Sequence, residues 1–168
     1  MKNIYLVGFM GTGKTAVGKE LAQKKKWHFV DLDELIELKE KRPITDIFAK
    51  EGEAYFRKIE SKTLKGVAKE KDFVVACGGG IVINEENTKV MKESGIIICL
   101  SAKPEIILKR ISGATHRPLL NVENPKEKIE LLLKLRSPYY AKADKTIDTS
   151  RLSIKEVVAK ISKIMVQC

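Results

Sequence analysis

Short apolar runs alternate with longer amphipathic segments along this chain, and the alternation predicts strands separated by helices. The runs that are short and apolar enough to be buried strands lie at 4–7, 28–31, 73–77, 96–100 and 146–148. Continuous apolar strands separated by helices are typical of a parallel sheet covered on both faces. We therefore expect an α/β fold whose ligands bind beyond the carboxyl ends of the strands.

Two of the expected helices have recognisable starts. Asn124 precedes Pro125 and stands three residues before Glu127, which is the pattern of a capped first turn. Ser153 stands three residues before Glu156 in the same way. We expect Asn124 and Ser153 to be the N-caps of two helices.

Composition sets bounds on size, partners and location. The chain has 168 residues, 43% of them hydrophobic, so we expect one domain over 1–168. Lys and Arg number 32 against 22 Asp and Glu, which gives a net charge of +10, but the lysines are interleaved with glutamates rather than gathered in a block. This pattern disfavours a nucleic-acid partner. Three cysteines without a C-x-x-C pair, no signal peptide and no bilayer-length apolar run predict a cytoplasmic protein that binds no membrane, and we expect a monomer.

The segment 8–15, "GFMGTGKT", has the spacing of a phosphate-binding loop. Gly8, Gly13, Lys14 and Thr15 satisfy G-x-x-x-x-G-K-[ST] between an expected strand and an expected helix. Backbone N–H groups of such a loop surround a phosphate, the lysine bridges phosphates, and the hydroxyl binds Mg²⁺. The chain has no N-K-x-D guanine motif, and its third strand ends in "CGGG" without an acid, so a GTPase switch is disfavoured.

Two carboxylates follow the second expected strand in "VDLDELIE". In extended backbone Asp31 and Asp33 would point the same way, one toward the Mg²⁺ shell and the other toward an acceptor hydroxyl. The alternative is that an aspartate caps a helix starting near Glu34. Both interpretations can hold if each belongs to a different carboxylate.

A charged pair and a triple glycine lie farther along the chain. In the helical pattern that includes "GEAYFRKIE", Arg57 and Glu60 flank an apolar stripe, either as an ordinary surface pair or as a partly buried, positioned one. The glycines at 78–80 end the third expected strand, where they permit a ligand to approach the backbone or form a tight turn. Cys77 beside them is interpreted as a small core residue.

The polar segment 112–124 lies between two expected helices and contains Gly113 and Pro118. A loop of this length is often a lid, and closure would carry Arg117 onto a transferred phosphoryl group. We expect His116 to be exposed. Only six of the 32 basic residues are arginine, and Arg is suited to bidentate binding of carboxylate and phosphate.

Together these segments resemble shikimate kinase over nearly the full chain. The matching pieces, in the family's order and spacing, are "LVGFMGTGKTAVGKELA", "DLDELIE", "ITDIFAKEGEAYFRKIE", "CGGGIV", "RPLL" and "LRSPYYAKAD". The resemblance implies a P-loop fold like that of nucleoside-monophosphate kinases, a three-layer sandwich with a five-stranded parallel sheet. It also implies transfer of the ATP γ-phosphoryl group to the shikimate 3-hydroxyl in aromatic amino acid (chorismate) biosynthesis, with ATP as co-substrate and Mg²⁺ as cofactor.

The resemblance also implies roles for individual residues. It places shikimate on Asp33, Arg57, Gly79, Gly80 and Arg136. It places ATP on Gly11, Thr12, Gly13, Lys14, Thr15, Ala16, Arg110 beside the adenine, and Arg117 on the lid. It places catalysis on Lys14, Asp33 and Arg117, and Mg²⁺ on Thr15 with Asp31 in support. Glu60 would orient Arg57, and Arg151 is not assigned because "DTSRLSIKE" matches the family only loosely.

Two other classes stay open at this stage. One is a regulatory domain that binds nucleotide without catalysis, which the presence of Asp33 and Arg57 disfavours. The other is a basic RNA-associated ATPase, whose RNA binding would depend strongly on salt.

Overall fold

The strands of the structure lie within one residue of the predicted runs. The computed structural model describes residues 2–113 and 122–166. The strands are β1 (Asn3–Val7), β2 (His28–Asp31), β3 (Phe73–Ala76), β4 (Gly95–Ser101) and β5 (Lys145–Asp148). The predicted third strand was one residue too long, because Cys77 follows the end of β3. The other differences are single residues added at strand ends, where the hydrogen-bond ladder rather than hydropathy sets the boundary.

Helices connect these strands and follow the last of them. They are α1 (Lys14–Lys25), α2 (Leu32–Glu40), α3 (Ile44–Val67), the 3₁₀ turn η1 (Ile81–Ile83), α4 (Glu85–Ser94), α5 (Pro104–Ile111), α6 (Pro125–Tyr140) and α7 (Ile154–Val166). Both predicted N-caps are confirmed, since the Asn124 side chain accepts from the N–H of Glu127 and that of Ser153 from the N–H of Glu156. Within the described residues, no helix is long and apolar enough to cross a bilayer.

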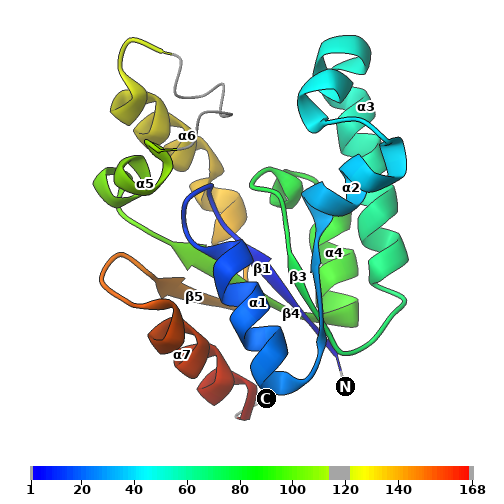
Figure 1. Cartoon of the computed structure of the whole chain (residues 1–168), viewed down its shortest axis with the longest axis vertical. Coiled ribbons are helices and arrows are strands. Elements are labelled where there is room, and N and C mark those ends of the chain that lie inside the picture. Colours follow the sequence, from blue (N-terminus) through cyan, green and yellow to red (C-terminus); the bar gives the residue numbers. More distant parts are fainter. Residues whose placement is uncertain (1, 114–121, 167–168) are drawn as a thin grey trace.

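All five strands are parallel and lie in the order β2-β3-β1-β4-β5, with β1 in the centre. Alternate residues of each strand point to opposite faces. On one face Ile4 and Leu6 of β1 pack in a cluster with side chains of α1 and α7. On the other, Tyr5 and Val7 pack with side chains of α3, α4 and η1. The result is the expected three-layer α/β sandwich (Figure 1).

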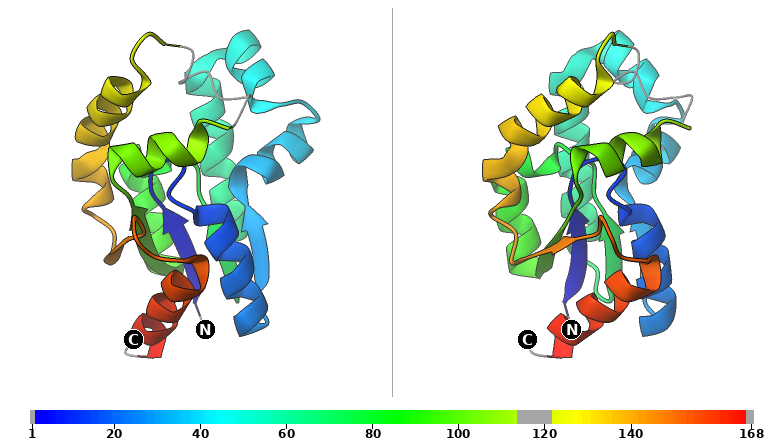
Figure 2. Two further views of the ribbon diagram at one scale, coloured as in Figure 1. Left: turned by 60° about the vertical axis from the view of Figure 1, so that its left-hand side comes forward. Right: turned by 90° about the vertical axis from the view of Figure 1, so that its left-hand side faces the viewer.

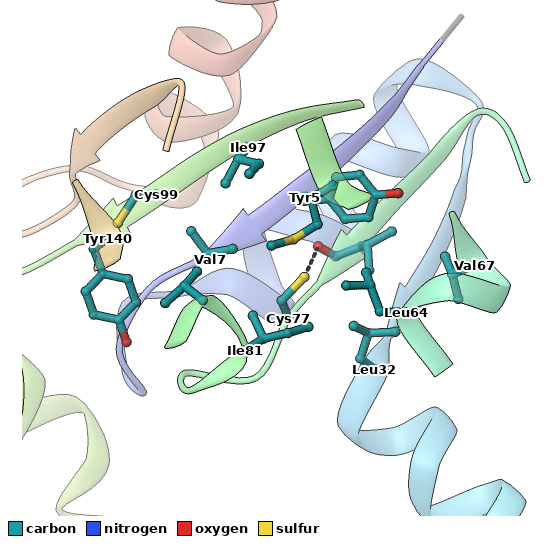
Figure 3. Close-up of a cluster of buried hydrophobic side chains, with 13 residues drawn as sticks. Tyr5, Val7, Leu32, Leu64, Val67, Cys77, Ile81, Ile97, Cys99 and Tyr140 are labelled. Atoms are coloured by element: carbon teal, nitrogen blue, oxygen red, sulfur yellow. Dashed lines mark hydrogen bonds between the residues drawn. The ribbon is translucent and has the colours of Figure 1, made fainter. Parts of the chain in front are cut away.

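The two buried cysteines among the described residues belong to the second of these faces. Cys77 and Cys99 lie among Tyr5, Val7 and Tyr140 in one buried cluster (Figure 3). Burial raises the pKa of the Cys99 thiol to about 11 and raises that of Cys77 well above its ordinary value. Both are therefore neutral thiols near pH 7, which confirms the interpretation of Cys77 as a core residue.

The carboxyl ends of the strands face a space bordered by two helical groups. Helices α5 and α6 lie on one side of the loop between β1 and α1, and α2 with the first part of α3 lies on the other (Figures 1 and 2). A cluster of Phe9, Ile107, Ile111 and Ile129 fixes α5 and α6 against that loop. A second cluster, Ile36, Ile47 and Phe56, joins α2 to α3. The phosphate loop between β1 and α1, the start of α2 and the glycine loop after β3 border this space.

Candidate active site

The phosphate loop leads from β1 into α1 along a path that requires glycine. Gly8 has φ +137° and lies so close to the Leu100 carbonyl that any Cβ would overlap it. Gly13 has φ +97° at the N-cap of α1 and offers no side chain to cap the helix. The first N–H groups of α1 are thus left for an anion. The Lys14 ammonium bends back over the loop and donates to the carbonyls of Gly8 and Phe9 at 2.8 and 2.9 Å.

Thr15 and Asp31 bring two hard oxygen atoms together beside this loop. The Thr15 hydroxyl donates to Oδ2 of Asp31 at 2.8 Å. Magnesium in nucleotide sites is commonly held by one or two protein oxygens together with phosphates and water, so this pair suits the ion. Within the described residues no group of three or more His, Cys, Asp and Glu forms a metal site, and a Mg²⁺–nucleotide complex requires none.

The expected geometry of Asp31 and Asp33 is wrong in one respect. Extended backbone ends at Asp31, and α2 already begins at Leu32, so Asp33 lies in the first helical turn. The reason is capping, because Oδ1 of Asp31 accepts from the N–H groups of Asp33 and Glu34. The two carboxylates nevertheless have different partners. Asp31 serves the helix start and Thr15, and Asp33 is left for another partner.

Asp33 is a carboxylate with an unsatisfied oxygen. Its Oδ1 is buried and has no hydrogen-bond partner among the described residues. Burial, followed by the charge of Asp31, raises its pKa to about 6, against the opposing effect of Lys14. A carboxylate with a pKa in this range is suited to accept a proton near neutral pH. The unused oxygen indicates where a donor such as a hydroxyl would bind.

Arg57 and Glu60 form the positioned pair rather than the surface pair. Glu60 is 1% exposed and its Oε2 accepts from Nη1 of Arg57 at 2.9 Å. Burial raises the pKa of Glu60, and the Arg57 charge opposes this. Arg57 also contacts Glu53 at 3.3 Å, but that glutamate is 66% exposed and adds little. The buried partner therefore fixes the guanidinium.

The three glycines after β3 lie against charged side chains, a different set at each glycine. A Cβ at Gly78 would lie 3.0 Å from Oδ1 of Asp33 and 3.0 Å from Oε1 of Glu60. One at Gly79 would lie 3.2 Å from Nη1 of Arg136, and one at Gly80 would overlap the Arg57 guanidinium. The glycines thus let four charged side chains from α2, α3 and α6 converge on one short loop. The segment also forms a tight turn, closed by the Ile81 N–H on the Gly78 carbonyl. None of the three glycines has a positive φ, so the close approach of protein side chains is what requires glycine here.

Three more of the predicted site residues, Ala16, Arg110 and Arg136, lie beside the phosphate loop or at the start of α1. Ala16 is exposed in the first turn of α1, and Arg136 lies with its guanidinium carbon 5.6 Å from the centre of the Phe9 ring. Arg110 of α5 donates to the Gly11 carbonyl and to Thr149, so it borders the phosphate loop. Arg117 and His116 lie outside the described residues.

Comparison with known proteins identifies the chain's family. A model of the shikimate kinase family matches residues 10–166. The chain belongs to the shikimate kinase family. The shikimate kinase of Thermodesulfovibrio yellowstonii is 50% identical over 163 residues, which are 97% of this chain and 94% of the relative. That of Thermoanaerobacter pseudethanolicus is 47% identical over 167 residues, 99% and 98% of the two chains.

A solved structure of the same family agrees in fold. The shikimate kinase from Acinetobacter baumannii, solved in complex with shikimate, superposes with a TM-score of 0.93 at 40% identity and covers 99% of this chain and 94% of its own. The two proteins therefore share the same fold, with a five-stranded parallel sheet of the P-loop kinase type.

Tyr140 contacts the glycine loop, and the sequence did not single it out. Its hydroxyl donates to the Gly79 carbonyl at 2.7 Å, from the last turn of α6. Burial raises the pKa of Tyr140 to about 12, so the hydroxyl keeps its proton and its role as donor. The only signal was its place in "LRSPYYAKAD", four residues after Arg136 and therefore on the same helix face.

Replacing Tyr140 by phenylalanine is expected to raise KM for shikimate about 3- to 30-fold. The change leaves the partly buried Gly79 carbonyl without its donor, at a cost of about 0.7–2 kcal/mol. Steady-state kinetics at saturating MgATP would measure it, with Tyr139→Phe as the matched control because the Tyr139 hydroxyl makes no hydrogen bond with the described residues. Equal KM values in the two variants would contradict a role for Tyr140 in holding the glycine loop.

Proposed function

We propose that this protein is a shikimate kinase that transfers the γ-phosphoryl group of ATP to the 3-hydroxyl of shikimate, within aromatic amino acid biosynthesis. The observation that carries the proposal is the convergence of Asp33, Arg57 and Arg136 on the glycine loop 78–80, beside a complete phosphate loop. One unpaired carboxylate and two guanidiniums match an acceptor with a hydroxyl and a carboxylate. Family membership supplies the identity of that acceptor.

On the acceptor side, a carboxylate takes the hydroxyl proton and two guanidiniums bind the carboxylate of shikimate. Asp33 accepts the proton of the attacking hydroxyl as the oxygen bonds to the γ-phosphorus and the bond to the β–γ bridging oxygen breaks, with ADP leaving. Arg57 and Arg136 bind the shikimate carboxylate through planar, bidentate forks. Gly79 and Gly80 let the two guanidiniums lie close to the backbone of the glycine loop, since a side chain at either position would meet one of them.

The nucleotide side uses backbone and a few side chains. The N–H groups of residues 11–16 surround the phosphates, Lys14 neutralises them, and Arg110 lies toward the adenine. Thr15 and Asp31 hold Mg²⁺, which supplies charge neutralisation for the transferred phosphoryl group. The proposal includes Arg117 on a lid at 112–124, and a single-domain, monomeric, cytoplasmic protein.

A coupled assay of ADP release tests the proposal. The purified protein would be given MgATP and, separately, shikimate, quinate, gluconate and other hydroxylated carboxylic acids. Of these acids, we expect only shikimate to give rapid ADP release. The product should carry one phosphate on its 3-oxygen, as detected by ³¹P and ¹H NMR. Preference for gluconate, or nucleotide binding without turnover on any acid, would overturn the proposal.

Lys14→Ala is expected to lower kcat about 10²- to 10³-fold with the fold intact. The lysine places a positive charge on the phosphates where negative charge develops, and loss of one such donor has an effect of this size. The melting temperature and kcat of Lys14→Ala would be compared with those of Lys19→Ala, an exposed lysine on the same helix. Turnover like that of the unaltered protein in a folded Lys14→Ala variant would remove the assignment.

A further inference from the structure

Thr149 joins three segments that are far apart in the sequence. It follows β5 directly and is 3% exposed. Its N–H donates to the Ser101 carbonyl at the end of β4, at 2.8 Å. Its hydroxyl lies 3.1 Å from the Thr12 carbonyl and 3.0 Å from the Ser101 carbonyl, and accepts from Nη1 of Arg110 at 3.0 Å. The residue thus links the phosphate loop, the sheet and α5.

The single hydroxyl hydrogen of Thr149 has two possible acceptors. The hydroxyl is within hydrogen-bond distance of both carbonyls, but the Ser101 carbonyl already receives the N–H of Thr149. Among the described residues, the Thr149 hydroxyl is the one donor that reaches the Thr12 carbonyl. A donor is worth most where a buried acceptor would otherwise go unpaired. The hydrogen is therefore directed to Thr12.

Arg110 acts on the neighbouring peptide of the same loop. Its Nη1 donates to the Gly11 carbonyl at 3.1 Å, and its Nη2 donates to the Thr149 carbonyl at 2.8 Å. One guanidinium thus holds both the phosphate loop and Thr149. We call Arg110 and Thr149 together the 110–149 clasp.

The two carbonyls that the clasp holds control the N–H groups that a phosphate needs. In a trans peptide the N–H points away from the carbonyl, and no peptide among the described residues is cis. A fixed Gly11 carbonyl therefore fixes the N–H of Thr12, and a fixed Thr12 carbonyl fixes that of Gly13. Gly11 and Gly13 have φ of +74° and +97°, and glycine on either side makes these peptides easy to rotate.

We propose that Thr149 is a positioning residue for nucleotide binding, which through the 110–149 clasp turns the N–H groups of Thr12 and Gly13 into the phosphate loop. Neither Thr149 nor the Gly11 and Thr12 carbonyls need touch the nucleotide. The role differs from contact with the adenine, because it acts on the phosphate end through the backbone. It rests on the proposed function only in taking ATP as the nucleotide.

Thr149→Val tests this inference, because valine keeps the shape and removes the hydroxyl. We expect the Kd for ATP, measured by calorimetry without shikimate, to rise about 5- to 50-fold. KM for MgATP should rise with it, whereas KM for shikimate at saturating MgATP should stay within about twofold. Thr149→Ser restores the hydroxyl and should return both nucleotide constants to within about threefold of those of the unaltered protein.

Two controls keep the result interpretable. Thr146→Val makes the same chemical change at an exposed position of β5 and should alter neither constant. Amide NMR resonances of Thr12 and Gly13 should move in Thr149→Val and return in Thr149→Ser, whether or not the protein phosphorylates shikimate. Unchanged ATP affinity in a folded Thr149→Val protein, equal losses for both substrates, or a serine variant no better than valine would each overturn the inference.

Discussion

Asp33→Asn is expected to lower kcat/KM for shikimate about 10²- to 10⁴-fold without lowering the melting temperature. The loss follows from removal of the group that takes the hydroxyl proton, an effect of this order for positioned general bases. We expect the melting temperature not to fall because the pKa of Asp33 is raised to about 6 in the folded protein. At pH 7.5, above the pKa in both states, the folded protein carries the full cost of ionising a carboxylate that is partly buried. Asparagine removes that cost.

The Asp33→Asn measurement has a matched control in the same helical turn. Glu34 is exposed, so Glu34→Gln should keep both activity and melting temperature. Melting would be followed at pH 7.5 and kinetics at saturating MgATP. A fall of less than about fivefold in kcat/KM for Asp33→Asn would contradict the role of proton acceptor. A marked fall in the melting temperature would contradict the claim that this carboxylate is a cost to the fold.

Arg57→Lys is expected to lower kcat/KM for shikimate roughly 30-fold to several thousand-fold, although the charge is unchanged. Lysine cannot reproduce the planar fork, and it leaves the 1%-exposed Glu60 without its close partner. Truncating one side of a desolvated charged pair typically costs about 2–5 kcal/mol, or tenfold for each 1.4 kcal/mol. Because Gly80 packs against the Arg57 guanidinium, the loss should fall on shikimate, with KM for MgATP nearly unchanged.

Arg42 provides the comparison for Arg57. It also pairs with two glutamates, Glu40 and Glu51, at the junction of α2 and α3, but none of the three glycines faces it. Arg42→Lys should therefore change kcat/KM less than about threefold, as expected for partly exposed pairs. A loss under threefold for a folded Arg57→Lys protein would remove its role as carboxylate-binding residue.

The sequence predicted the sheet well, because buried parallel strands are continuous apolar runs that β1, β3 and β4 display plainly. It predicted the phosphate loop equally well, because G-x-x-x-x-G-K-[ST] encodes a local backbone path that needs no distant partner. Asp33 was misplaced for a local reason. Whether Asp31 ends a strand or caps a helix depends on its own side-chain hydrogen bonds to Asp33 and Glu34, which spacing alone does not settle.

The residues that the sequence missed depend on distant contacts. Tyr140 lies at the end of a helix and Thr149 after a strand, and nothing near them in the sequence indicates that their hydroxyls reach Gly79 and Thr12. The burial of Glu60 was undecided for the same reason. A glutamate on the edge of an apolar stripe is exposed or buried according to what packs on it, and here that is the loop at Gly78.

The contacts that hold the two ligand loops also bear on how the chain acquires activity. Arg110 and Gly11 are separated by 99 residues, Thr149 and Thr12 by 137, and Tyr140 and Gly79 by 61. Contacts of such separation carry a large loop-closure entropy and form after local helices. The chain can therefore be rich in helix while its loops are still unable to hold ligand. Recovery of catalysis after dilution from denaturant should lag behind recovery of the helical signal.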